Sequence, residues 1–139
     1  MGRNPLWRDP LPDAGSATFW GSLDPVDRFA LHAVGSVRFF PRRALLCRQT
    51  QRSAPVYLIY AGLVEVFRTG LDGERVVLAR LAPGDIVGDR AAVDEGGAVA
   101  TVEVVEPTKA LEIPAEWFAG LCRHRPRIAW QVLANAVAH

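Results

Sequence analysis

The spacing of apolar residues changes twice along this chain. It is helical just before residue 37 and after residue 113, and it follows the alternation of strands in between. Between residues 37 and 113, short runs of β-branched and aromatic residues are separated by turn residues, and apolar and polar positions alternate at 64–68. This period of two predicts β-strands with one face toward water. The expected strands are 37–40, 44–47, 56–61, 63–69, 75–81, 99–105 and 109–113.

A helical period precedes the strands. Asp24 can cap a helix, Pro25 suits the first helical position, and Gly35 suits the stop. Spacings of three and four residues predict one apolar face on this helix, which serves either as a coupling helix or as a plain packing helix. The face consists of Val26, Phe29, Ala30, Ala33 and Val34.

Two more helices follow the strands. The first opens at 114–116 and ends at 124–126, where the last helix begins. The last helix carries an apolar stripe up to the end of the chain, and such a face must be buried. Either it folds back on the strands or it pairs with a second copy of the chain. In the second case the predicted dimer interface consists of Ile128, Val132, Leu133 and Val137.

Short strands at even spacing, with helices only at the ends, predict a mainly β fold. We expect a jelly-roll barrel, or double-stranded β-helix, of about eight strands with flanking N- and C-terminal helices. Residues 1–19 are expected to form an N-terminal arm that docks through Trp7 and Phe19. The barrel domain with its helices is then 20–126, and 127–139 begin a C-terminal dimerisation helix.

Composition narrows the function classes. The chain has 139 residues and half of them are apolar, which suits one domain with a hydrophobic core. The formal net charge is +1, so no global field attracts nucleic acid or a membrane. No apolar run approaches the ~20 residues of a membrane span, and the N-terminus lacks the apolar core of a signal peptide. We expect a cytoplasmic protein.

Candidate metal ligands and catalytic groups are scattered. Cys47 and Cys122 lie far apart, and His32, His124 and His139 match no ligand motif. No nucleophile stands beside a base, and no two carboxylates have a useful spacing. The sequence therefore predicts no metal site and no enzyme, and two reduced, mostly buried thiols.

One stretch resembles a known phosphate-binding cassette. Residues 84–92 read GDIVGDRAA and residues 98–102 read AVATV. Cyclic nucleotide-binding domains have G-D-x-F-G-E-x-A-x, a loop, and P-R-x-A-T-V in this place. Further stretches are similar in order and spacing to Crp/Fnr-type effector domains, and the resemblance implies their barrel and terminal helices. These stretches are 45–46, 56–66, 72–74 and 81–85.

The resemblance implies a ligand-binding role for residues of this cassette. Gly88 lets the backbone approach the ligand. Asp89 stands where the family has a Glu that accepts a hydrogen bond from the ribose 2′-hydroxyl, and it is one methylene shorter. Exposed N–H groups at a helix start favour a phosphate. The amides belong to Arg90, Ala91 and Ala92, and the second half of the cassette contributes Ala98 and Val99.

Ala98 stands where the family has the arginine that grips the cyclic phosphate. Hydrogen bonds to a charged group contribute about 1.5–3 kcal/mol each, so losing one or two weakens binding about tenfold to several thousandfold. Val99 adds no hydroxyl in compensation. Either Arg90 supplies the charge, or Arg75 or Arg80 does so from a neighbouring strand; alternatively, Arg90 is a solvated surface side chain.

Two function classes remain. The first is a Crp/Fnr-type sensor that binds cAMP, cGMP or another small phosphate ligand weakly and passes the change to its last helix. The second is a ligand-free dimerisation or protein-docking module of the same fold. The chain ends within what resembles the family's dimer helix, and it holds no recognition helix with a basic face, so we expect no DNA binding by this chain alone. In a longer protein, a DNA-binding domain is expected after His139.

Overall fold

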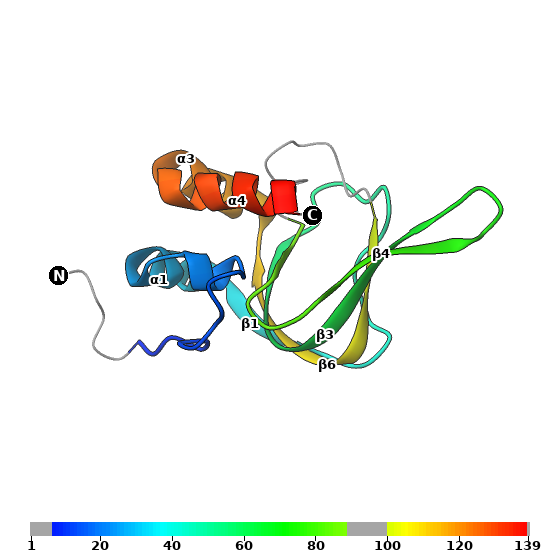
Figure 1. The fold of residues 1–139 in the computed structure, drawn as a ribbon, viewed down its shortest axis with the longest axis horizontal. Helices are drawn as coiled ribbons and strands as arrows, with labels where there is room; N and C mark the ends of the chain where they lie inside the picture. The colour runs from blue at the N-terminus through cyan, green and yellow to red at the C-terminus, as the bar shows by residue number, and fades with distance from the viewer. Residues whose placement is uncertain (1–6, 89–99, 139) are drawn as a thin grey trace.

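The helices lie together on one side of a β-barrel (Figure 1). The computed structural model describes residues 7–88 and 100–138. Its helical elements are η1 (Trp20–Ser22), α1 (Pro25–Val34), α3 (Ala115–His124) and α4 (Pro126–Ala138). None of the described helices is long and apolar enough to cross a bilayer.

Antiparallel strands make up one sheet that curves into the barrel. In the described part of the chain its order is β1 (Ser36–Phe40), β6 (Thr101–Ile113), β3 (Val56–Thr69) and β4 (Arg75–Leu81). Two short strands join it, β2 (Leu45–Cys47) beside β6 and β5 (Ile86–Val87) beside β3. The hairpin of β3 and β4 projects from the end of the barrel away from the helices (Figure 1). The predicted mainly β fold with helices at both ends is confirmed.

The two central strands are longer than predicted. The sequence predicts breaks at Gly62 and Pro107, but β3 and β6 continue through them. Gly62 has φ +103°, and a Cβ there would collide with Thr108 and the Pro107 carbonyl. The pairing register of β3 and β6 shifts around this point. Glycine and proline therefore produce irregular, bulged pairing here, where the sequence predicts turns.

Helix α1 begins as predicted, but it buries a different face. Asp24 accepts a hydrogen bond from the Asp27 N–H at 2.9 Å, and Pro25 is the first helical residue. The buried residues of α1 are Asp27 and Leu31, whereas Val26 of the predicted apolar face is 58% exposed. Arg125 donates to Asp27 Oδ1 at 3.1 Å, which offsets part of the cost of burying this carboxylate, whereas its Oδ2 has no hydrogen-bond partner among the described residues.

Two clusters of buried side chains lie on opposite faces of the sheet. Along β3, Leu58 points to the helices while Tyr57 and Ile59 point into the barrel, as the alternation of a strand requires. We call the clusters the helix-side core and the barrel core. The helix-side core includes Trp20, Leu31, Leu58, Leu111, Phe118 and Ile128. The barrel core includes Tyr57, Ile59, Val64, Val87, Val102 and Val104.

The apolar stripe of α4 folds back on its own chain for part of its length. Ile128 is fully buried and Val132 is 7% exposed, both in the helix-side core. Leu133 is 60% exposed, and Val137 lies beyond the side chains that the structure describes. Ile128 and Val132 are thus covered by their own chain, which differs from the free dimer seam that the sequence predicts. The pairing of two copies stays a prediction.

The N-terminal arm packs on α1 through the expected aromatics. The Trp7 ring meets the Phe29 ring edge-on, with centroids 5.4 Å apart. Phe19 is 2% exposed in the helix-side core. The arm thus contributes apolar side chains to the same core as the helices.

Candidate functional site

The candidate site begins where the chain leaves β5. Val87 pairs with Tyr57 of β3 and is buried. Gly88 follows with φ +85°, and a Cβ there would lie 3.1 Å from the carbonyl oxygen of Pro55. Any L-residue would meet both backbone strain and a tight contact at this point. The exit from β5 therefore requires a glycine for reasons within the fold.

The other predicted ligand-binding residues lie outside the described residues. Buried residues lie on both sides of 89–99: Val87 is 4% exposed and Ala100 is 5% exposed. The Cys47 thiol is 3.5 Å from the Ala100 carbonyl oxygen, to which it donates. The described residues on both sides of 89–99 thus belong to the buried wall of the barrel. The predicted residues within 89–99 are Asp89, Arg90, Ala91, Ala92, Ala98 and Val99.

Arg75 and Arg80 are engaged on the outer side of the sheet. Both extend from β4 to Glu65 of β3, whose neighbours Val64 and Val66 point into the barrel. The Arg80 Nε lies 3.1 Å from Glu65 Oε2, and the Arg75 Nη1 lies 3.2 Å from Glu65 Oε1. These ion pairs hold both guanidinium groups away from the barrel interior, so the structure gives neither arginine the role of the missing cation.

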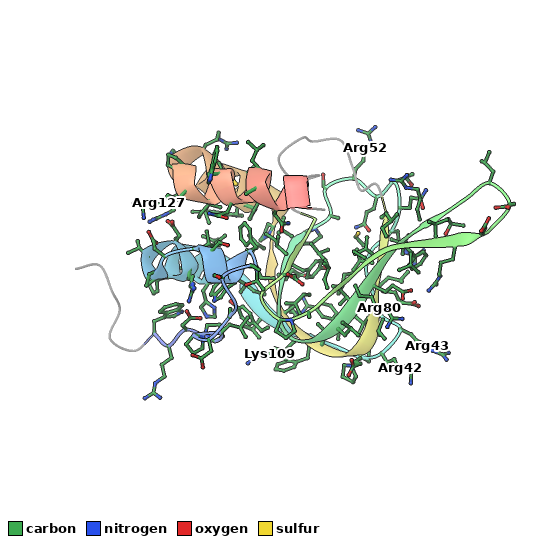
Figure 2. The ribbon with its side chains drawn as sticks, in the orientation of Figure 1. Arg42, Arg43, Arg52, Arg80, Lys109 and Arg127 are labelled. Carbon is green, nitrogen blue, oxygen red and sulfur yellow. The ribbon has the colours of Figure 1, made fainter. Side chains whose placement is uncertain are left out.

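Arg52 is a cation that the sequence interpretation missed. It belongs to the loop before β3, and Pro55 of the same loop contacts Gly88. Figure 2 shows Arg52 at the upper side of the barrel and Arg80 at the lower side. Because the loop approaches Gly88 only through tertiary packing, no local sequence signal identifies this arginine.

A polar row runs from Tyr57 in the barrel core to the exposed Arg38 of β1. The Tyr57 hydroxyl donates to Glu112 Oε2 at 2.9 Å, and Arg38 Nη1 donates to Glu112 Oε1 at 3.0 Å. Burial raises the pKa of Tyr57, and the hydrogen bond to Glu112 raises it further, so the phenol stays protonated as a donor. Tyr57 pairs with Val87, which brings this row next to the exit of β5.

Comparison with known proteins identifies the family. The family model of the cyclic nucleotide-binding domain matches residues 37–125. This chain belongs to the cyclic nucleotide-binding domain family. The cyclic AMP receptor protein of Thermus thermophilus is 33% identical over 97 residues, which are 70% of this chain and 45% of that protein.

Solved structures of regulators share the fold of this cyclic nucleotide-binding domain. The crystal structure of the Thermus thermophilus catabolite activator protein matches with a TM-score of 0.77 and 28% identity, over 86% of this chain and 56% of that chain. The N-terminal domain of a transcriptional regulator from Streptomyces coelicolor A3(2) matches with a TM-score of 0.67 and 26% identity, over 86% and 83%. The chain spans about half the length of the Thermus relatives. The predicted jelly roll and the resemblance to Crp/Fnr-type effector domains are confirmed.

Burial shifts the pKa of two titratable groups elsewhere in the cyclic nucleotide-binding domain, Cys47 and His32. Within 7–88 and 100–138, no group of three His, Cys, Asp or Glu side chains suits a metal ion. Burial raises the pKa of the Cys47 thiol. Burial also lowers the pKa of His32, whose Nδ1 lies 3.0 Å from the Tyr60 hydroxyl.

Proposed function

We propose that this domain is the ligand-sensing part of a Crp/Fnr-type transcriptional regulator and that it binds a cyclic nucleotide, or another small phosphate ligand, weakly. The family membership and the constrained Gly88 turn support a retained ligand frame. The observation that carries the weak binding is Ala98, which replaces the phosphate-binding arginine of the family pattern. A charge-assisted, bidentate contact to the phosphate is thereby lost.

Restoring the arginine tests this proposal. We expect Ala98→Arg to raise the affinity for cAMP or cGMP at least about tenfold, since hydrogen bonds to a charged group contribute about 1.5–3 kcal/mol each. Ala98→Gln is the matched control, because glutamine adds length without charge. Binding is measured as the rise in melting temperature with increasing nucleotide. Equal gains for arginine and glutamine would contradict a missing charge.

Arg52 is our candidate for a residual phosphate contact. Its loop lies against Gly88, and a flexible guanidinium on that loop can approach an anion there. If it does, Arg52→Gln lowers the remaining affinity, whereas Arg42→Gln, on the lower side of the view in Figure 2, leaves it unchanged. Equal affinities of the two variants would remove Arg52 from the proposed site.

A ligand-free dimerisation or protein-docking module is the second candidate function. Three large apolar side chains on the C-terminal helices favour it: Trp117 is 58%, Trp130 is 65% and Leu133 is 60% exposed. Exposed groups of this kind mark interaction surfaces when they are contiguous. No melting shift with either nucleotide, in the parent or in Ala98→Arg, would favour this module over the sensor.

The proposed sensor has no catalytic role. It acts in the cytoplasm as a homodimer, and it reaches DNA only through a further domain, because the described helices offer no recognition helix with a basic face. Its named relatives are a receptor protein, an activator and a transcriptional regulator. Gel-shift assays of this chain on its own are expected to give no band beyond nonspecific binding.

A further inference from the structure

The described part of the N-terminal arm, together with η1, crosses the helix side of the barrel; we call residues 7–23 the N-terminal strap. Asp9 holds the strap to α1. Its Oδ1 accepts from Trp20 Nε1 at 2.9 Å and from the Leu11 N–H at 2.8 Å, and its Oδ2 accepts from Arg28 Nη1 at 2.7 Å. Arg28 also donates through Nε to the Trp20 carbonyl at 2.9 Å. Such charge-assisted bonds are the strong kind, so Asp9 fixes the place of Trp20.

The strap also touches the turn that leads to the candidate site. The Trp20 N–H donates to the Gly84 carbonyl at 3.0 Å. Gly84 has φ +96°, and a Cβ there would lie 2.7 Å from the Thr18 hydroxyl oxygen. Thr18 is itself held, since its hydroxyl donates to the Gly15 carbonyl at 2.7 Å. Backbone of the strap and backbone of the turn are thus in direct contact.

The turn transmits this placement to the exit of β5. The Gly84 N–H donates to the Ile59 carbonyl at 2.8 Å, and the Ile59 N–H donates to the Asp85 carbonyl at 3.0 Å. The Asp85 carboxylate accepts from the Ala82 N–H at 2.9 Å and closes the turn. Only three residues separate Gly84 from Gly88, and two of them, Ile86 and Val87, form β5, so the chain connects the turn to Gly88 through a strand paired with β3.

From these contacts we propose that Asp9 and Trp20 are positioning residues for the site at Gly88. They contact no ligand; they fix the turn at Gly84, and through it the backbone that begins the cassette. The consequence for ligand binding rests on the proposed function. If ligand binding requires this backbone placement, an occupied site must in turn strengthen the docking of the strap, because coupling between two sites is reciprocal.

Hydrogen exchange followed by NMR tests the positioning role without any ligand. Asp9→Ala removes the hydrogen bonds that Asp9 accepts from Trp20, Leu11 and Arg28, and Asp9→Asn keeps a neutral acceptor for Trp20 and Leu11. Asp13→Asn is the matched control, because Asp13 is an exposed aspartate of the same strap. The readout is the exchange of the Ile59, Gly84 and Asp85 amides, compared with the remote Gly70 amide of the projecting hairpin.

We expect Asp9→Ala to speed exchange at the Ile59, Gly84 and Asp85 amides at least about tenfold, as the loss of a hydrogen bond to a charged group implies. Exchange at Gly70 stays unchanged, Asp9→Asn gives partial rescue, and Asp13→Asn behaves as the parent. Two outcomes overturn the proposal: fast exchange at the Trp20 amide with unchanged exchange at the turn, or an equal increase at all amides, which reports global destabilisation.

A second measurement separates this proposal from the proposed function. In a parent that binds cyclic nucleotide, Asp9→Ala lowers the affinity at least about threefold, and added nucleotide slows exchange at the Trp20 amide. Binding that is equal in parent and Asp9→Ala overturns the positioning role and leaves the proposed function intact. A parent that binds neither cAMP nor cGMP counts against the proposed function, and the exchange of the turn amides then decides the positioning role.

Discussion

Glu65 is 7% exposed although it lies on the outer side of the sheet. Two arginines pair with its two carboxylate oxygens, and Arg75 also donates to Glu103 at 3.2 Å and stacks 3.7 Å above the Phe67 ring. The two arginine side chains therefore cover the carboxylate while they remain partly exposed to water themselves. This arrangement ties β4 to β3 at the base of the projecting hairpin.

Glu65→Gln tests how much this cluster stabilises the fold. We predict a loss of about 1.5–3 kcal/mol in the free energy of unfolding, the usual range for hydrogen bonds to charged groups. The loss stays below that of a fully buried pair, since Arg75 and Arg80 are 47% and 60% exposed and regain water. Glu103→Gln is the control and costs at most about 1 kcal/mol. Equal losses in urea denaturation would show that Glu65 is not the centre of the cluster.

Asp9 gives the stability a defined pH dependence. Burial raises the pKa of this carboxyl, but hydrogen bonds from Arg28, Leu11 and Trp20 together outweigh it and hold the pKa below its usual value. The stabilisation is therefore complete above the unfolded-state pKa of about 3.9 and is lost as the pH falls through the lower folded-state pKa.

The parent is predicted to lose melting temperature more steeply than Asp9→Asn as the pH falls from about 5 toward 2. Asparagine does not titrate, so the variant lacks this contribution at every pH. The two melting curves should converge in acid. A constant difference between them from neutral to acidic pH would contradict the lowered pKa.

At the scale of elements, Gly62 keeps β3 continuous where the register shifts. We predict that Gly62→Ala costs about 1–3 kcal/mol more than Gly73→Ala, the usual cost of overpacking a filled site. Both glycines have positive φ, at +103° and +82°, but a Cβ on Gly62 collides with Thr108 whereas a Cβ on Gly73 meets nothing within 4 Å. Chemical denaturation of the pair separates the collision from the backbone preference. Equal costs would mean that conformation alone requires Gly62.

Local signals predicted the elements better than their junctions. The cap at Asp24 and the proline at the start of α1 act within one turn, so their residue types suffice to locate the helix. The continuity of β3 through Gly62 depends on pairing with β6, which lies about 40 residues away in sequence. The local spacing of apolar residues gives no sign of this pairing. The buried Asp27 was missed for the same reason, because its partner Arg125 belongs to the other end of the chain.

At the scale of the whole molecule, the sequence predicted the family and a glycine turn at Gly88, but not the segments that pack around this turn. Gly88 was identifiable from the cassette pattern, and its positive φ agrees with a glycine requirement. The loop with Arg52, the row at Glu112 and the strap contact at Gly84 come from segments far apart in sequence. Contacts between such distant segments form through tertiary packing. They cannot be predicted from a single sequence when no covariation between the positions has been observed.

Two adjacent residues of α4 allow assembly and stability to be tested separately, because one is buried and the other is exposed. Val132 is 7% exposed in the helix-side core, so Val132→Asp buries an unpaired charge and lowers the melting temperature in any oligomeric state. Leu133 is 60% exposed, so Leu133→Asp should change the stability of a single chain by no more than about 0.5 kcal/mol. In a dimer joined along the exposed side of α4, however, the same aspartate would lie in the interface.

We therefore predict that the parent sediments as a dimer and that Leu133→Asp shifts it to monomer with nearly unchanged far-UV circular dichroism. Leu133→Ala is the milder control and should weaken association without abolishing it. Both measurements are needed, because a lower mass with a lost β-signal would report unfolding. Stable dimers usually bury at least about 1,000 Å², so an interface on this face must extend beyond Leu133 itself. A Leu133→Asp variant that stays dimeric would show that the interface does not include this face of α4. A parent that is monomeric at about 100 μM would show that α4 alone does not join two copies of the chain.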